Sequence, residues 1–181
     1  LPVFARMVLA DEAGDLVSNW TSSRILDQVA EPFGASVHRT DVGPPAIAEA
    51  VMDLGVHVGG EGSGSVLYAP FSYGFDSFYF VARLVAFLRR EGVRLADVAG
   101  DLADPDICKE TLNLPPERVY RALETLETEA VSQRRLKDGY YLEGPGWWLS
   151  VRASSTLSMI RLIGEGEGLA PVLARMREVI R

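Results

Sequence analysis

The stretch "VGGEGSGSVLYAP", residues 58–70, places four glycines, two serines and one glutamate between two short apolar runs. Glycine loses more backbone freedom on folding than other residues, so such a loop usually marks a tight bend or a close approach. The runs that flank it, residues 56–58 and 65–69, are expected to be strands. The lone carboxylate, Glu61, therefore lies in a tight loop between two strands.

Outward from this loop, short apolar runs alternate with helical patterns. A helix is expected to end near Gly34, another starts with Pro45 in its first turn and ends at Gly55, and Asp76 is expected to cap a longer, almost completely buried helix. Further strands are expected at residues 6–10, 15–20 and 35–40. This alternation predicts an α/β domain with a mixed, largely parallel sheet and flanking helices.

The pattern changes near Gly100, where a polar turn cluster indicates a boundary between a domain at residues 1–99 and a second at 100–181. Neighbouring strands and two helices predict that the second domain is a small α+β domain with an antiparallel sheet. The expected order is strand, helix, hairpin, strand and helix, at residues 107–114, 115–130, 139–152, 159–166 and 169–181.

Composition excludes several classes of protein. The chain has 181 residues and a formal net charge of −7, and an acidic chain repels phosphate backbones, so nucleic acid is not an expected partner. A run of 18 apolar residues is lacking, so no membrane span is expected. The single cysteine, Cys108, forms no internal disulfide, which favours the cytoplasm. The chain begins with Leu1 and has no signal-peptide pattern, which is compatible with a piece excised from a longer protein.

Three segments, in order, carry a resemblance to a known family. They are "HRTDVGPPAIAEAVMD" (38–53), "VGGEGSGSVLYAPFSYGFDSFYFVARLVAFLRREGVRLADV" (58–98) and "GWWLSVRASSTLSMIRLIGEGEG" (146–168). They are similar to the "R-T-x-V-G" turn, the "GGE-x-S/N-G" sugar loop and the "RPSGTEP…R" phosphate loop of the α-D-phosphohexomutases, the phosphomannomutase and phosphoglucomutase family. The resemblance covers residues 15–181 and corresponds to the third and fourth of the family's four domains.

The resemblance implies a fold and a reaction scheme. In the family, a phosphoserine in the first domain exchanges a phosphoryl group with a hexose phosphate, and magnesium in the second domain assists. The third domain reads sugar hydroxyls and the fourth holds the non-reacting phosphate. This chain would be the C-terminal half of such an isomerase, with hexose phosphate as ligand and, as partner, a chain or domain that carries the phosphoserine and magnesium loops.

The sugar-binding residues implied by the resemblance are Glu61, Ser63, Gly60 and Gly62. A carboxylate accepts hydrogen bonds from two neighbouring hydroxyls, a serine both donates and accepts, and glycines let backbone approach the ring. A plain tight turn with a solvated glutamate is the competing interpretation of the same residues.

The implied phosphate-binding residues are Arg152, Ser154, Ser155, Thr156 and Arg161, which offer cationic and hydroxyl donors. The loop departs from the family pattern, because Ala153 replaces the proline, Ser155 the glycine, and Leu157-Ser158 the Glu-Pro. An ordinary strand–turn–strand with surface arginines is the alternative, and phosphate binding stays open.

The N-terminus departs further. Laid on the family's "DPDGDRLALVDEKG", residues 1–14 put Leu1, Val3 and Ala5 at the three metal aspartates, so no metal ligand or cofactor is expected in this chain. Whether residues 1–14 are a remnant of the second domain stays open. No residue is assigned as catalytic, and the chain alone is expected to be inactive. A non-catalytic relative with a degenerate site, serving sugar-phosphate binding, regulation or protein interaction, is the alternative. The preferred hexose phosphate and the oligomeric state stay open.

Overall fold

The computed structural model describes residues 1–102, 106–128, 133–154 and 157–180. The chain divides into two compact units, Leu1–Asp104 and Pro105–Arg181. The first unit contains, in chain order, α1 (Pro2–Asp11), β1 (Leu16–Asn19), α2 (Ile25–Ala30), the 3₁₀ turn η1 (Glu31–Phe33), β2 (Val37–Thr40), α3 (Pro44–Leu54), β3 (Val58–Gly60), β4 (Val66–Tyr68), β5 (Ser72–Phe75), α4 (Ser77–Glu91) and α5 (Leu95–Gly100).

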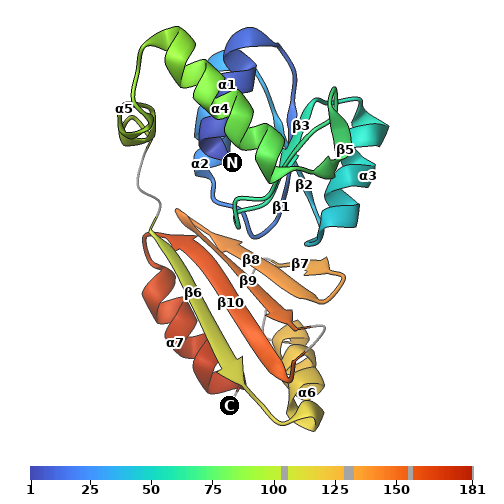
Figure 1. The fold of residues 1–181 in the computed structure, drawn as a ribbon. Coiled ribbons are helices and arrows are strands. Elements are labelled where there is room, and N and C mark those ends of the chain that lie inside the picture. Colours follow the sequence, from blue (N-terminus) through green and yellow to red (C-terminus); the bar gives the residue numbers. More distant parts are fainter. Residues whose placement is uncertain (103–105, 129–132, 155–156, 181) are drawn as a thin grey trace. The chain divides into compact units, whose positions relative to one another are not determined.

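The first unit is a three-layer α/β/α structure around a mixed five-stranded sheet with the order β2-β1-β3-β4-β5. Strands β2, β1 and β3 are parallel, whereas β4 and β5 continue the sheet as antiparallel strands. Helix α3 covers one face, and α1, α2 and α4 lie on the other (Figure 1). Successive strand residues point to opposite faces, so Leu16 packs under α1 and α2 while Val17 packs under α3. The expected mixed α/β sheet with flanking helices is confirmed.

The N-terminal segment differs from expectation. Residues 6–10, expected to be a strand, lie inside helix α1, which begins with Pro2 in its first turn. In α1, Phe4 and Ala5 are fully buried, and Met7 and Val8 are each 1% exposed. Apart from Arg6, residues 3–10 are all apolar, and periodicity alone cannot distinguish such a continuous apolar run from a buried strand.

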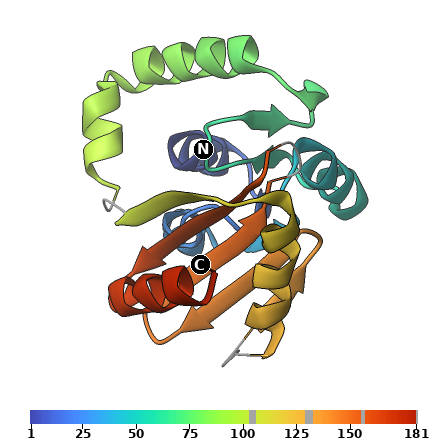
Figure 2. The same ribbon diagram turned by 90° about the horizontal axis from the view of Figure 1, so that it is seen from below.

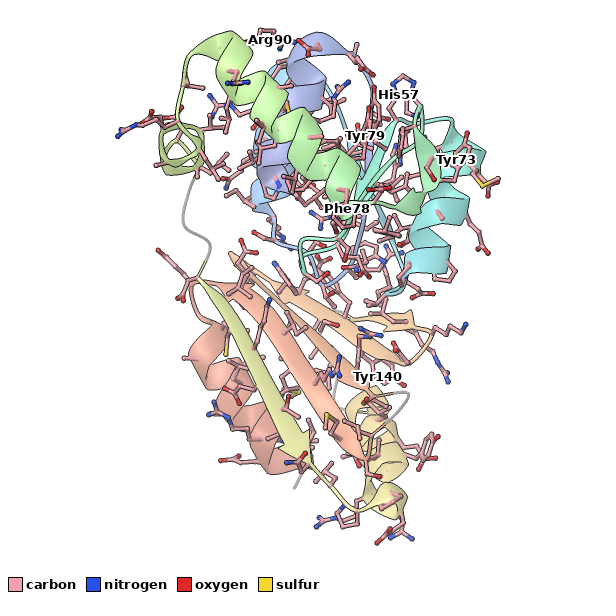
Figure 3. The ribbon with its side chains drawn as sticks, in the orientation of Figure 1. His57, Tyr73, Phe78, Tyr79, Arg90 and Tyr140 are labelled. Carbon is pink, nitrogen blue, oxygen red and sulfur yellow. The ribbon has the colours of Figure 1, made fainter. Side chains whose placement is uncertain are left out.

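Helix α4 forms where it was expected but is not buried as expected. The Asp76 carboxylate accepts a hydrogen bond from the Tyr79 backbone amide, and Gly92 ends the helix in the left-handed conformation. None of its residues is buried, and Phe78, at its first turn, is 91% exposed (Figure 3). Only one side of α4 contacts α1, through residues such as Phe80, so the apolar content of the helix overstates its burial.

The second unit is an antiparallel five-stranded sheet with the order β6-β10-β9-β8-β7. Its elements are β6 (Ile107–Asn113), α6 (Pro116–Thr128), β7 (Gln133–Leu136), β8 (Gly139–Gly144), β9 (Trp147–Ala153), β10 (Met159–Gly166) and α7 (Leu169–Ile180). Helices α6 and α7 lie on the same face of the sheet (Figure 2) and share one core with β8, β9 and β10. The expected α+β arrangement is confirmed. Within the described ranges, no helix is long and apolar enough to cross a bilayer.

Candidate functional site

The Glu61 loop lies at the carboxyl ends of the parallel strands of the first unit. It follows β3 directly, and the neighbouring strand β1 ends at Asn19, one residue after Ser18, which pairs with Gly60 in the parallel register. Ligands of open α/β sheets bind at this edge, where loops from adjacent strands meet. The two loops that meet here are residues 61–65 and residues 20–24.

The loop closes on itself as a compact turn. The Glu61 amide donates to the Ser65 carbonyl over 2.9 Å, and the Gly64 amide donates to the Glu61 carbonyl over 3.0 Å. Gly64 has a φ of +95°, in the region that side chains disfavour, so a glycine is required there. The backbone around Glu61 is therefore fixed by its own hydrogen bonds.

The Glu61 carboxylate uses its two oxygens differently. Oε1 accepts a hydrogen bond from the Asn19 side-chain amide over 3.1 Å. Oε2 lies 3.5 Å from the Ser63 hydroxyl, which in turn is 3.4 Å from the Ser65 hydroxyl. Contacts of that length are weak, so Oε2 and the exposed Ser63 hydroxyl keep most of their capacity for another partner. One carboxylate oxygen is held by the protein, and the other faces a small group of hydroxyls.

The glycines around Glu61 are in close contact with the protein itself. A Cβ atom on Gly59 would lie 2.7 Å from Val51 Cγ2 in α3, and one on Gly60 would lie 2.8 Å from the Ser65 carbonyl oxygen. The Gly62 amide donates to the Ser22 hydroxyl over 3.0 Å. Gly59 and Gly60 thus have a packing requirement of their own, whatever else their backbone approaches.

Sequence reasoning missed the residues that support this loop. Asn19 and Ser22 are 1% and 4% exposed and lie at the end of β1. Arg39, on β2, donates to the carbonyls of Asn19, Ser22 and Ser23 over 3.3, 2.8 and 3.4 Å. The available signal was the polar cluster "NWTSSR" (19–24), whose first two residues were assigned to the strand expected at residues 15–20. Ser23 accepts a hydrogen bond from the Ile25 amide just before α2, whose N-cap residue is Arg24.

In the second unit, Arg152 and Arg161 lie opposite each other on β9 and β10 and share one face of the sheet. The Arg152 guanidinium is held by a bidentate ion pair with Asp138. The Arg161 side chain is exposed and has no ion pair with any described residue. Ser154 accepts a hydrogen bond from the Leu157 amide over 3.3 Å. The other two predicted phosphate-binding residues, Ser155 and Thr156, lie outside the described residues.

The N-terminal positions do not fit a magnesium site. Leu1 caps α1, and Val3 and Ala5 lie within it, with Ala5 fully buried. None of the three side chains carries an oxygen ligand, and magnesium requires oxygen ligands in near-octahedral geometry. No chemical step is assigned to a metal at these positions.

A cluster of polar and aromatic groups lies at the other end of β3, where His57 precedes the strand (Figure 3). Glu12 accepts hydrogen bonds from His57 Nδ1 over 2.8 Å and from the Tyr68 hydroxyl. Burial raises the pKa of Glu12, but the hydrogen bonds from Tyr68 and His57 outweigh it and lower the pKa overall. Burial and the Glu12 carboxylate raise the pKa of Tyr68 to about 12. This cluster ties the end of α1 to β3 and β4, away from Glu61.

The comparison with protein families gives a match over residues 1–105. The matched family is described as "Phosphoglucomutase/phosphomannomutase, alpha/beta/alpha domain III". The chain belongs to the phosphoglucomutase/phosphomannomutase family. The match starts at residue 1 and so includes α1 together with the sheet and the Glu61 loop.

Curated relatives of this mutase family extend the likeness to most of the chain. A probable phosphoglucosamine mutase of Methanopyrus kandleri is 29% identical over 171 residues, which are 92% of this chain and 38% of that protein. A phosphoglucomutase/phosphomannomutase of Thermococcus kodakarensis is 28% identical over 168 residues, 90% of this chain and 36% of that protein. The chain thus spans about two fifths of the length of the curated relatives it matches.

Solved structures of the same superfamily share the fold. The crystal structure of a phosphoglucomutase/phosphomannomutase family protein from Burkholderia thailandensis aligns with all of this chain and 39% of that one, at a TM-score of 0.76 and 24% identity. An N-acetylglucosamine-phosphate mutase in a product complex aligns with 98% of this chain, at a TM-score of 0.63 and 12% identity. These likenesses support the fold of both units.

Proposed function

We propose that this chain supplies the sugar-reading and phosphate-holding half of a hexose phosphate mutase and binds hexose phosphate through the Glu61 loop. The observation that supports this most directly is the Glu61 carboxylate, which is anchored through Oε1 and presents Oε2 beside the Ser63 hydroxyl. Paired sugar hydroxyls donate well to a carboxylate fixed in this way. Ser63 adds a group that both donates and accepts.

The second unit would contribute the phosphate contacts. Arg152 and Arg161 present two guanidinium groups on one face of adjacent strands, and a phosphate dianion favours such pairs. Asp138 neutralises part of the charge of Arg152, so Arg161 would be the stronger contact.

Catalysis is proposed only for a complete assembly. The curated relatives are more than twice as long as the stretch that this chain matches, and no residue here is assigned to phosphoryl transfer. A partner chain or domain with the phosphoserine and magnesium loops would complete the reaction. A cytoplasmic location is part of the proposal, supported by the low cysteine content.

The test is a titration of the ¹⁵N-labelled 181-residue chain with glucose 1-phosphate, mannose 1-phosphate and glucosamine 1-phosphate, with inorganic phosphate as the control ligand. Shifts of the amide signals of Gly60, Gly62 and Ser63 with the sugar phosphates, absent with phosphate alone, would support the proposal. Glu61→Ala should abolish these shifts. Glu49→Ala, which removes an exposed carboxylate from α3, should leave them unchanged.

Absence of shifts up to millimolar sugar phosphate would refute sugar binding by this chain. Shifts that survive Glu61→Ala would place the ligand elsewhere. The three sugars differ at C2, and glucosamine carries a cation there, so their ranking also reports which hexose the loop prefers.

A further inference from the structure

Asn19 connects the end of β1 to the Glu61 loop through both ends of its side-chain amide. Its Oδ1 accepts hydrogen bonds from the Thr21 amide, the Thr21 hydroxyl and the Ser22 hydroxyl over 3.1, 2.9 and 3.1 Å. Its Nδ2 donates to Glu61 Oε1 over 3.1 Å. The Thr21 backbone amide can only donate, so the oxygen end of the Asn19 side chain must face it. The nitrogen end is then directed at Glu61.

A second link runs in parallel through Ser22. Its hydroxyl donates to Asn19 Oδ1 and accepts from the Gly62 amide, which immediately follows Glu61. Ser18, also on β1, donates to the Gly60 carbonyl over 2.8 Å. The residues on both sides of Glu61 are therefore held by β1 and its following turn.

The turn that carries Asn19 is itself held from β2. The Arg39 side chain is 11% exposed, donates to the carbonyls of Asn19 and Ser22, and forms an ion pair with Asp27. An arginine so enclosed fixes the turn through several planar donors at once. Asn19 is thus presented to Glu61 from a rigid platform.

We propose that Asn19 is a positioning residue for Glu61: it orients the carboxylate so that one oxygen is occupied and the other is presented to a ligand hydroxyl. The proposal rests on the proposed function for the identity of the ligand. Glutamate has three rotatable side-chain bonds and stands here among glycines, so without an anchor its carboxylate would sample many orientations. Holding it in advance lowers the entropic cost of binding.

Asn19→Asp tests this with little change of shape. The aspartate keeps an oxygen acceptor for Thr21 and Ser22 but replaces the donor that faces Glu61 with a carboxylate oxygen. Like charges then repel, and Glu61 should leave its position. We expect the amide signals of residues 60–64 to shift in the ligand-free protein, and the Kd for glucose 1-phosphate to rise at least tenfold, which corresponds to about 1.4 kcal/mol.

In the double variant Asn19→Asp/Glu61→Gln, the amide of residue 61 can donate a hydrogen bond to the carboxylate of residue 19, so the contact is restored with donor and acceptor exchanged. It should return the ligand-free signals of residues 60–64 towards those of the Glu61→Gln variant alone. Thr21→Val is the matched control, since it removes one hydrogen bond to Asn19 Oδ1 and leaves the donor to Glu61 in place. It should change the Kd less than twofold.

Two results would overturn the proposal. One is an Asn19→Asp variant whose loop signals and Kd match the wild type. The other is a double variant that stays as perturbed as Asn19→Asp, which would assign Asn19 to folding alone. The ligand-free signals decide between these outcomes even if the wild-type chain binds no sugar phosphate, so a failure of the proposed function is distinguishable from a failure of this one.

Discussion

Replacing Gly59 by alanine is expected to destabilise the first unit by forcing α3 away from the sheet. A Cβ atom at this position would lie 2.7 Å from Val51 Cγ2 and 2.8 Å from Ile47 Cγ2. Carbon atoms normally approach to about 3.5–4.0 Å, so each contact is too close by roughly 1 Å. Val51 and Ile47 are fully buried in the core between α3 and the sheet, so we expect α3 itself to move.

The magnitude follows from two opposing effects. Overpacking of a well-filled core costs about 1–3 kcal/mol, while replacing glycine by alanine in an extended strand returns about 0.5–1 kcal/mol of backbone entropy. The middle of the two ranges gives a net loss of about 1 kcal/mol for Gly59→Ala. For a domain of about 100 residues this corresponds to a fall in Tm of roughly 4–8 °C.

The assay is urea unfolding followed through the backbone amide signals of β1 and β3, because the two units need not unfold together. Gly100→Ala is the control: a Cβ atom there meets nothing within 4 Å and the φ is ordinary, so only the backbone entropy changes and stability should stay the same or rise by up to about 1 kcal/mol. Val51→Ala removes the methyl groups that a Cβ atom on residue 59 would contact. The double variant Gly59→Ala/Val51→Ala should therefore lose less free energy of unfolding than the sum of the losses of the two single variants. Strict additivity, or a Gly59→Ala variant as stable as the wild type, would refute the reasoning.

Three further outcomes are expected from the first unit. Tyr68→Phe removes the hydroxyl donated to Glu12, whose side chain is 30% exposed, and should cost about 1 kcal/mol in urea unfolding. A backbone amide and then a histidine lower the pKa of Asp15, so its stabilising contribution is complete above the unfolded value near 3.8 and is lost as pH falls through the folded value. Asp15→Asn should accordingly flatten the dependence of the urea midpoint on pH below about 4. Phe78→Ala should change stability by less than about 0.5 kcal/mol, whereas Phe80→Ala, which removes a ring packed on α1, should cost about 2 kcal/mol by thermal unfolding.

Elements whose ends are marked by proline or glycine were predictable from the sequence. Helix α3 begins with prolines and ends at Gly55, which adopts the left-handed conformation with a φ of +65°. The hairpin of β8 and β9 turns at residues 144–146, where Gly146 has a φ of +77°. In each case the chemistry of one or two residues fixes the boundary, and no distant contact is needed.

Elements defined by their packing were not predictable in the same way. Helix α1 was expected to contain a strand because its apolar residues are nearly continuous, and only tertiary contacts with α2 and α4 decide which face is buried. Helix α4 was correctly predicted as a helix, but its apolar residues also predicted a buried position, and none of its residues is buried in the first unit. Apolar content measures what a helix is able to bury, whereas the neighbours decide what it does bury.

The candidate site divides along the same line. Glu61 and Ser63 are predicted as site residues because a short motif carries them, whereas Asn19 is 42 residues from Glu61 in sequence and has no periodic signature. Its role follows from the parallel pairing of β1 with β3, which brings the ends of the two strands together. A polar residue at the end of a buried strand becomes informative only once the strand order is known.

The glycines around Glu61 appear in the sequence as a flexible segment, yet the structure gives them separate and specific surroundings. Gly59 packs directly against α3, Gly60 lies against the Ser65 carbonyl, and Gly64 has a positive φ that residues with side chains rarely adopt. These three glycines are needed because a neighbour is close or because the turn is tight, so a larger residue at any of them would disturb the segment. The Glu61 carboxylate is held in a defined position in this loop, and the proposed recognition of sugar hydroxyls would depend on that order.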